Sequence, residues 1–288
     1  MEITIIGGDK RNLELANLFK KDGYRVNLVG FDADDISTSF QLKSMEDALY
    51  DADIVVGPIP LTTDGIHINS PLNGLKLGLN DLINSMKKNQ VFMAGKISQE
   101  LESLIESRGI KTLDLMDRED MAVLNSIPTA EGAIQIAMEE MDTTIFASNV
   151  LVLGFGRLGK ILAKTLAALG ARVSVAARKT SDLSWIRAYG YEAIDIKDLY
   201  FHLEDKDLIY NTIASRILDE KALMKINKKS MIIDLASKPG GLDFDKARKL
   251  GIRAIWALGL PGRVAPHSAA QILRDTIYNI MEDLEVMK

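Results

Sequence analysis

The chain has 288 residues, 47% of them hydrophobic and 26% charged, with a formal net charge of −5. This balance is typical of a globular protein with room for two domains, and the scattered charges leave no basic surface that would indicate nucleic-acid binding. The absence of cysteine excludes disulfides, thiolate catalysis and cysteine-ligated metals, and the three histidines lie too far apart to show metal-ligand spacing, so no metal is expected.

The chain begins with a short apolar run, Ile3–Ile6, that ends in two glycines. Because no basic segment precedes this run, we expect a first β-strand rather than a signal peptide. No stretch approaches the roughly 18 apolar residues that a membrane span needs. The sequence therefore predicts a cytoplasmic protein without membrane contact.

Short apolar runs alternate with segments of helical spacing through the first part of the chain. The expected strands are Ile3–Ile6, Arg25–Val29, Asp53–Val56, Val91–Ala94 and Lys111–Leu113. Such alternation is typical of parallel strands joined by helical crossovers. The stretch Leu61–Leu79, rich in turn formers, breaks the pattern. A loop of this length is usually functional or mobile, and a solvated surface excursion is the alternative.

Residues 129–142 have the spacing of a helix that would carry the chain into a second domain. Thr129 is a candidate N-cap, and Glu131 would lie in the first turn. A second series of strands follows at Val150–Leu153, Arg172–Ala176, Leu208–Tyr210, Met231–Asp234 and Ile252–Ile255. The last helical pattern, Ala265–Asp283, has no strand left to follow, so we expect it to return to the first domain.

The strand at 150–153 runs directly into Gly154-Phe155-Gly156-Arg157-Leu158-Gly159, and helical spacing follows. This order of strand, GxGxxG turn and helix is the fingerprint of a dinucleotide site. Gly154 allows the tight turn, Gly156 lets a pyrophosphate approach the backbone, and Gly159 lets the helix pack on the strand. The phosphates would lie at the helix N-terminus, where N–H groups favour anions. A glycine-rich turn without a ligand is the alternative.

Arg178 and Lys179 follow the next expected strand, where an NAD site would place a carboxylate for the ribose 2′-hydroxyl. No carboxylate is present there, and two cations can pair with a 2′-phosphate. The sequence therefore favours NADP(H) over NAD(H), although basic residues in a loop are often only solvated.

Two further segments lie at the carboxyl ends of expected strands, where ligands bind in such sheets. These candidates for the nicotinamide half of the site are Asn211, Thr212 and Ile213 in one segment and Ala236 and Ser237 in the other. Ordinary strand-to-helix turns are the alternative, with nearly equal weight for Ser237.

These elements predict an α/β protein of two Rossmann-like, parallel-sheet domains with a cleft between them and a C-terminal helix that returns to the first domain. The expected boundaries are 1–128 for a substrate- or partner-binding domain, 129–265 for a Rossmann domain that binds NADP and is entered by the 129–142 helix, and 266–288 for the C-terminal helix.

Five motifs are spread over the whole chain: Ile6-Gly7-Gly8-Asp9 with Arg11, the crossover Asn125–Gly132, the turn Gly154–Gly159, and the late segments Asp234–Gly241 and Gly259–Pro266. Together they resemble the motifs of one family, the dehydrogenase-like A-type subunits of dipicolinate synthase. The crossover and the cofactor half are also similar to those of alanine dehydrogenases and adenosylhomocysteine hydrolase.

The resemblance implies NADP-dependent formation of dipicolinate from a dihydrodipicolinate-type precursor of the lysine pathway. It also implies a partner, the flavoprotein-like B-type subunit of dipicolinate synthase, and a location, the mother-cell cytoplasm of a sporulating bacterium. Another NADP-dependent dehydrogenase of an amino or imino acid is one alternative, and a non-catalytic cofactor-binding protein that supports a flavoprotein is the other. A homo-oligomer is common for such folds, but no feature of the sequence specifies one.

The substrate that the resemblance implies, a small dicarboxylate heterocycle, needs cationic anchors and a group that accepts a ring proton as hydride leaves. Arg11, Lys96 and Arg263 are the candidate anchors. Lys96, Glu131 and His267 are the candidates for proton transfer, with His267 favoured because histidine titrates near neutral pH. For each of them, a role as surface charge, cap or satisfied polar contact is the alternative.

Overall fold

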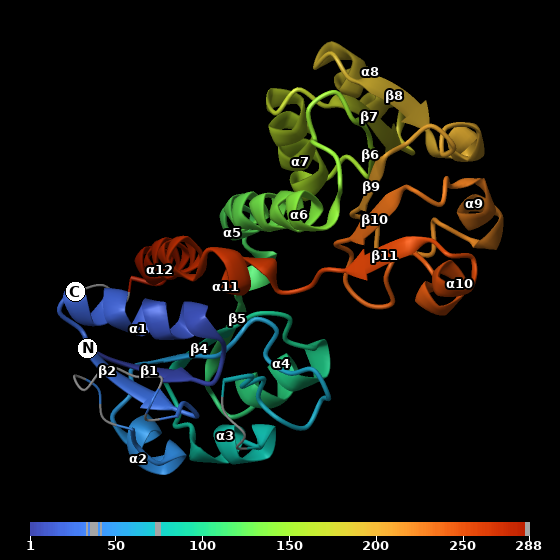
Figure 1. Ribbon diagram of the computed structural model, residues 1–288. Helices are drawn as coiled ribbons and strands as arrows, with labels where there is room; N and C mark the ends of the chain where they lie inside the picture. The colour runs from blue at the N-terminus through green and yellow to red at the C-terminus, as the bar shows by residue number, and fades with distance from the viewer. Residues whose placement is uncertain (33, 35–39, 41, 73–75, 286–288) are drawn as a thin grey trace. The chain divides into compact units, whose positions relative to one another are not determined.

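Two parallel sheets organise the chain in the computed structural model, which describes residues 1–32, 34, 40, 42–72 and 76–285 (Figure 1). The first unit comprises Met1–Asn125 and Ala265–Lys288, and the second comprises Ser126–Val264. Strands alternate with helices along both units, and the pairings recorded between the named strands are parallel. The α/β class and the two Rossmann-like sheets predicted from the sequence are confirmed.

The sheet of the first unit has the strand order β2-β1-β3-β4-β5. Its strands are β1 (Glu2–Ile6), β2 (Arg25–Val29), β3 (Ile54–Val56), β4 (Val91–Ala94) and β5 (Lys111–Asp114). The order reverses between β1 and β3, and ligands of such sheets bind beside that reversal, at the carboxyl ends of the strands. The loops that follow β1 and β3 are therefore the first place to look for substrate-binding groups.

Successive residues of these strands are buried on opposite faces of the sheet, as the period of two requires. Ile3 and Ile5 pack into a core with the helices α1 (Lys10–Lys21), α5 (Glu119–Leu124) and α12 (Pro266–Asp283). Ile6 packs into the opposite core, with α2 (Met45–Tyr50), α3 (Leu79–Ser85) and α4 (Gln99–Glu106). A 3-10 turn, η2 (Leu115–Asp117), joins β5 to α5.

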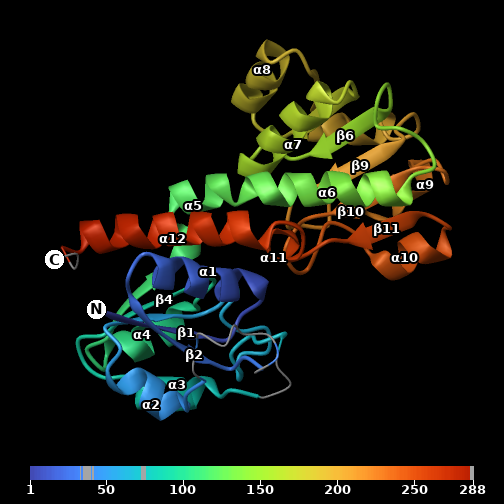
Figure 2. The ribbon, with the colours of Figure 1, turned by 60° about the vertical axis from the view of Figure 1, so that its left-hand side comes forward.

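The C-terminal helix α12 belongs to the first unit although the whole second unit precedes it in sequence. It lies along α1 and also contacts α5 (Figure 2). Leu273 and Ile277 are buried on its inner face, and the Tyr278 hydroxyl donates to Asp22 at the end of α1 (2.8 Å). The expected return of this helix to the first domain is confirmed.

The sheet of the second unit has the strand order β11-β10-β9-β6-β7-β8, which is that of a dinucleotide-binding Rossmann fold. Its strands are β6 (Asn149–Leu153), β7 (Arg172–Ala177), β8 (Glu192–Asp195), β9 (Leu208–Asn211), β10 (Met231–Asp234) and β11 (Arg253–Trp256). The order reverses between β6 and β9. The glycine turn after β6 and the candidate segment after β9 thus lie on the two sides of this reversal.

The sequence did not predict the edge strand β8. Its four residues, Glu-Ala-Ile-Asp, include two charged ones, and only Ile194 is fully buried. The hydrophobic signal of a short edge strand is weak because one side of it has no neighbouring strand. β8 is ordered by its pairing with β7, a contact between residues about 18 positions apart.

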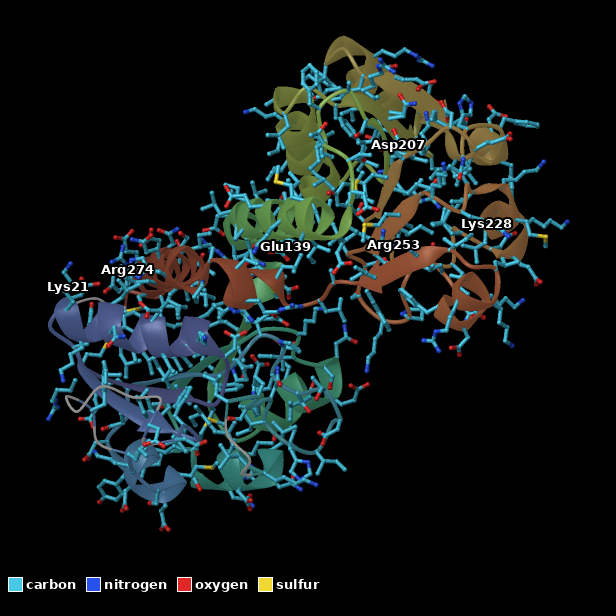
Figure 3. The ribbon with its side chains drawn as sticks, in the orientation of Figure 1. Lys21, Glu139, Asp207, Lys228, Arg253 and Arg274 are labelled. Atoms are coloured by element: carbon cyan, nitrogen blue, oxygen red, sulfur yellow. The ribbon has the colours of Figure 1, made fainter. Side chains whose placement is uncertain are left out.

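Helices cover both faces of the second sheet. One core is shared with α6 (Ser126–Glu140), α7 (Arg157–Ala168), α8 (Thr180–Ala188) and α11 (Leu260–Val264), and the other with η3 (Ile196–Phe201), α9 (Glu220–Lys225) and α10 (Phe244–Lys249). The buried Tyr210 hydroxyl donates to the Ala133 carbonyl of α6 (3.2 Å). Arg253, labelled in Figure 3, donates to the carbonyl and the carboxylate of Glu140, so the end of α6 is tied to β11.

The crossover helix differs from its prediction. α6 spans Ser126–Glu140 rather than 129–142, and Thr129 lies inside it rather than at its N-cap. Pro128 is the third residue of the helix, where the missing N–H costs nothing because first-turn N–H groups have no intrahelical partner. Glu131 accordingly lies in the second turn and not in the first.

The loop after β3 is more regular than its composition suggests. Isolated antiparallel bridges join Thr62 to Ile68 and His67 to Gly78. Asn73 and Gly74, two of the turn formers noted in the sequence, lie outside the described residues. Over the part of the chain that is described, no helix has the length and apolarity that a membrane crossing requires.

Candidate functional site

The turn after β6 has the conformation that its three glycines predict. Gly154 has a φ of 101°, and a side-chain carbon there would lie 2.4 Å from Thr212 Oγ1. A side-chain carbon on Gly159 would lie 2.1 Å from the Gly154 carbonyl oxygen. Both positions exclude any larger residue, so these glycines hold α7 tightly against the end of β6.

Gly156 differs from the other two because it faces open space. An added side-chain carbon would have no atom within 4 Å, and the φ of −79° is available to any residue. The fold itself therefore does not require glycine here. Gly156 is also the N-cap of α7, without a side-chain capping bond, which leaves an approach to the positive end of the helix. This geometry fits the pyrophosphate of a dinucleotide.

The other residues of the turn contribute differently. Phe155 is buried, its ring centroid lies 6.2 Å from that of Tyr189, and the Lys160 ammonium lies 5.3 Å from its centre. Leu158 is half-buried against the same core, and Arg157 is exposed. The side chains of Phe155 and Leu158 thus hold the turn against the core. Their backbone groups are the part available to a nucleotide.

Arg178 and Lys179 follow β7, the neighbour of β6 in the sheet. The Gly154 N–H donates to the Ala176 carbonyl (2.9 Å), so the glycine turn and the end of β7 lie side by side. Both side chains are exposed, and no ion pair is recorded for either among the described residues. Two cations that have no ion-pair partner among the described residues therefore lie beside the glycine turn, as the 2′-phosphate hypothesis requires.

The loop after β9 closes the other side of the crevice. Thr212 Oγ1 donates to the Leu153 carbonyl (2.8 Å), which joins this loop to the strand that carries the glycine turn. Asn211 is fully buried, whereas Thr212 and Ile213 are half-buried. Asn211 therefore shapes the loop from beneath, and the two residues after it remain accessible to a ligand.

In the loop after β10, Ala236 is buried and Ser237 is exposed. The fully buried Asp234 lies beneath both loops and accepts hydrogen bonds from Asn211, Ala236 and Gly241. From the sequence, Asp234 was predicted as the end of a strand and the start of the motif Asp234–Gly241, without a role in the site. An acidic residue that closes an otherwise apolar strand just before a glycine-rich loop was the signal available to find it.

In the first unit, the Arg11 guanidinium is bound by other residues of the protein. Its guanidinium is 6% exposed and forms a two-point ion pair with Asp9, with Nε–Oδ1 and Nη2–Oδ2 distances of 2.9 Å. Nη2 also donates to the Ile59 carbonyl (3.0 Å) in the loop after β3. Arg11 thereby joins the loops after β1 and β3, and much of its donor capacity is already used.

Lys96 is held at the end of β4 in a left-handed conformation with a φ of 57°. The Asp114 carboxylate accepts the N–H groups of Lys96 (3.0 Å) and Ile97 (2.7 Å). The side chain is exposed, and the described part of the chain offers it no ion-pair partner. Of the three candidate anchors, Lys96 therefore combines a fixed backbone with an available ammonium group.

The remaining candidates belong to both units. His267, at the start of α12, contacts Glu14 of α1 (Nδ1–Oε2 2.9 Å), and its side chain is 60% exposed. This contact gives the histidine a structural role on the surface of the first unit. Glu131 and Arg263 are exposed residues of the second unit. The described contacts do not join the proton-transfer candidates His267, Lys96 and Glu131 to one another.

A second histidine of the first unit, His67, is also oriented by a carboxylate. His67 Nδ1 lies 2.7 Å from Asp64 Oδ2 in the loop after β3. The hydrogen bond from the His67 side chain, together with the N–H groups of His67 and Ile66, holds the pKa of Asp64 well below its ordinary value. The carboxylate therefore stays charged and fixes the ring. Their spacing of three residues in a turn-rich loop was the sequence signal that this pair offered.

Comparisons with known proteins agree with this architecture. The family model for the N-terminal domain of the dipicolinate synthase A-type subunit matches residues 2–116, and that of shikimate/quinate 5-dehydrogenase matches residues 135–243. The chain is 36% identical to the A-type subunit of dipicolinate synthase from Bacillus subtilis (strain 168) over 288 residues, which cover 99% of this chain and 97% of that protein.

Solved structures extend the comparison. The crystal structure of the dipicolinate synthase A-type subunit from Bacillus halodurans has a TM-score of 0.89 and 35% identity, with 97% of each chain covered. An L-alanine dehydrogenase, at 15% identity, shares the fold alone, with a TM-score of 0.67 over 100% of this chain and 90% of that one. The resemblance predicted from the motifs is confirmed: the chain belongs to the family of dipicolinate synthase A-type subunits.

Proposed function

We propose that this protein is an NADP-dependent oxidoreductase that forms dipicolinate from a dihydrodipicolinate-type precursor by hydride transfer. The observation that carries the cofactor part is the open space at Gly156 beside the exposed Arg178 and Lys179. The dehydrogenase fold and the family membership support the reaction class. The expected partner is the flavoprotein-like B-type subunit, and the expected location is the mother-cell cytoplasm of a sporulating bacterium.

Each part of the cofactor has residues suited to hold it. Gly156 and the first turn of α7 would hold the pyrophosphate, and Arg178 with Lys179 would hold the 2′-phosphate. The loops after β9 and β10 would surround the nicotinamide half, with Thr212, Ile213 and Ser237 as its accessible residues. When bound, NADP+ supplies the acceptor for a hydride.

The substrate side of the proposal rests on charge. A dicarboxylate ring needs cations, and the exposed ammonium of Lys96 and guanidinium of Arg263 can supply them. Arg11 would act mainly by holding the Asp9 and Ile59 loops in place. Proton removal is assigned to a residue of the set His267, Glu131 and Lys96, or to a water molecule, since aromatisation supplies much of the driving force.

Replacing Arg178 with alanine is expected to raise the Kd for NADP+ by roughly 10- to 100-fold, because a charge-assisted contact to the 2′-phosphate is lost. The Kd for NAD+, which lacks that phosphate, should change less than about threefold. Titration of the protein with each nucleotide, followed by calorimetry, measures both values.

Arg187 provides the matched control, because it is an exposed arginine in the last turn of α8, the helix that follows Arg178. Arg187→Ala removes the same charge from the same unit and should leave both affinities unchanged. An equal loss of NADP+ and NAD+ affinity in Arg178→Ala would contradict the 2′-phosphate assignment.

The reaction itself is tested with freshly prepared dihydrodipicolinate and NADP+, followed at the absorbance band of NADPH. Turnover by this chain alone is expected, and it would exclude the alternative of a non-catalytic cofactor-binding protein. Turnover only with an amino or imino acid would favour the other alternative, a related dehydrogenase. Absence of NADPH formation even after addition of the flavoprotein-like B-type subunit would overturn the proposal.

A further inference from the structure

A fully buried carboxylate lies beneath the loop that follows β10. Asp234, the last residue of that strand, accepts three hydrogen bonds: Oδ1 from Asn211 Nδ2 (2.7 Å) and the Ala236 N–H (3.0 Å), and Oδ2 from the Gly241 N–H (2.7 Å). Among the described residues no lysine or arginine pairs with it. The position of the carboxyl group therefore depends on the geometry of these three N–H donors.

Two of these donors are the two ends of one loop. Ala236 and Gly241 flank the exposed residues Ser237, Lys238 and Pro239, so the carboxylate closes the loop at its base. The Gly240 N–H donates to the Ser237 carbonyl (2.9 Å) within the loop. One buried side chain thus binds both ends of the loop that presents the exposed residues 237–239 at the carboxyl edge of the sheet.

The third donor connects this loop to its neighbour. Asn211 is paired with Asp234 in the sheet register, and its side chain also binds both the carbonyl and the N–H of Ile213 (3.0 and 3.1 Å). A side-chain carbon on Gly241 would lie only 2.0 Å from Asn211 Nδ2, so no residue larger than glycine fits at this position. The loops after β9 and β10 are therefore coupled through two buried side chains.

A further contact supports the loop from the edge of the sheet. The Trp256 indole N–H donates to the Ala236 carbonyl (2.8 Å), and its ring stacks on Phe244 with centroids 5.3 Å apart. The glycine turn and Arg178, by contrast, lie on the β6–β7 side and have no recorded bond to Asp234. The hydrogen bonds of Asp234 thus reach the loops after β9 and β10 directly, and they reach the glycine turn only through the bond from Thr212 to the Leu153 carbonyl.

We propose that Asp234 is a positioning residue that, with Asn211, fixes the two loops around the nicotinamide half of the cofactor. This role rests on the proposed function, because it assigns that half of NADP+ to these loops. It predicts that disturbing Asp234 weakens the binding of the complete dinucleotide while leaving the binding of its adenosine half unchanged.

The test compares two ligands in Asp234→Asn. The amide has one acceptor oxygen in place of two. At least one of the three N–H donors therefore loses its partner, that of Gly241 when the oxygen takes the Oδ1 position, while the size of the side chain is kept. The Kd for NADP+ is expected to rise at least about tenfold, whereas that for adenosine 2′,5′-bisphosphate should change less than about twofold. Hydrogen exchange at the Gly241 amide should become faster.

Asp245→Asn, an exposed acid-to-amide change on α10, is the matched control and should alter neither affinity. If Asp234→Asn does not fold, Trp256→Phe removes the bond to the Ala236 carbonyl and part of the stacking on Phe244, and a loss of about threefold for NADP+ but not for the bisphosphate is expected. Equal weakening of both ligands, or of neither, would overturn the positioning role. Failure of the wild-type protein to bind either ligand would instead overturn the proposed function, and this role with it.

Discussion

Gly156→Val is expected to weaken NADP+ binding by more than about 100-fold, equivalent to about 2.7 kcal/mol. The valine side chain would occupy the open space through which the pyrophosphate approaches the start of α7. The free energy of unfolding should change by only about 1 kcal/mol, since a φ of −79° suits valine and only the N-cap preference is lost. Calorimetric titration and denaturant unfolding measure the two quantities.

Gly159→Ala supplies the contrast. Its side-chain carbon would lie 2.1 Å from the Gly154 carbonyl oxygen, so α7 must move away from β6. This variant should lose stability as well as affinity. NADP+ affinity within about threefold of wild type in Gly156→Val would contradict the assignment of the pyrophosphate to this turn.

Ile277→Ala should destabilise the first unit by about 2–5 kcal/mol, the usual cost of a large-to-small change in a packed core. Ile277 is fully buried where α12 packs against α1 and the sheet. Nucleotide affinity should stay within about twofold of wild type, because the glycine turn belongs to the second unit. Denaturant unfolding followed by circular dichroism, with NADP+ titration below the transition, measures both effects.

Gln271→Ala is the control for that change, since Gln271 lies on the exposed side of the same helix. Its effect on stability should be within about 0.5 kcal/mol. If Ile277→Ala were as stable as Gln271→Ala, α12 would not be part of the core of the first unit.

Most of the fold could be predicted because its signals are local. The strand before Gly154 and the helix after it are each encoded in a short window, and the roles of the three glycines follow from their spacing. β8 was missed because a short edge strand depends on pairing with β7 rather than on its own composition. The start of α6 was misplaced because Thr129 was interpreted as the N-cap, whereas the helix begins three residues earlier, at Ser126.

The candidate site was harder to predict because it depends on partners distant in sequence. Arg11 looked like a free cation, but the carbonyl that it binds, Ile59, lies 48 residues away. His267 was predicted as a base, and its contact with Glu14, which spans 253 residues, could not be predicted. Asp234 gained its role only through the loop that folds back over it. Sequence spacing shows which residue types are present, and tertiary contacts decide which of them remain available to a ligand.

The insertion of the second unit between α5 and α12 has a consequence for synthesis on the ribosome. The second unit is continuous in sequence and can close its sheet as soon as Val264 has left the exit tunnel. The first unit cannot, because the helix that covers Leu15, Phe19 and the β1 side of its core is made only after the whole second unit. Its apolar face therefore stays uncovered while the second unit, about half the chain, is translated. Of the two nascent units, the first is thus the one that we expect to need a chaperone.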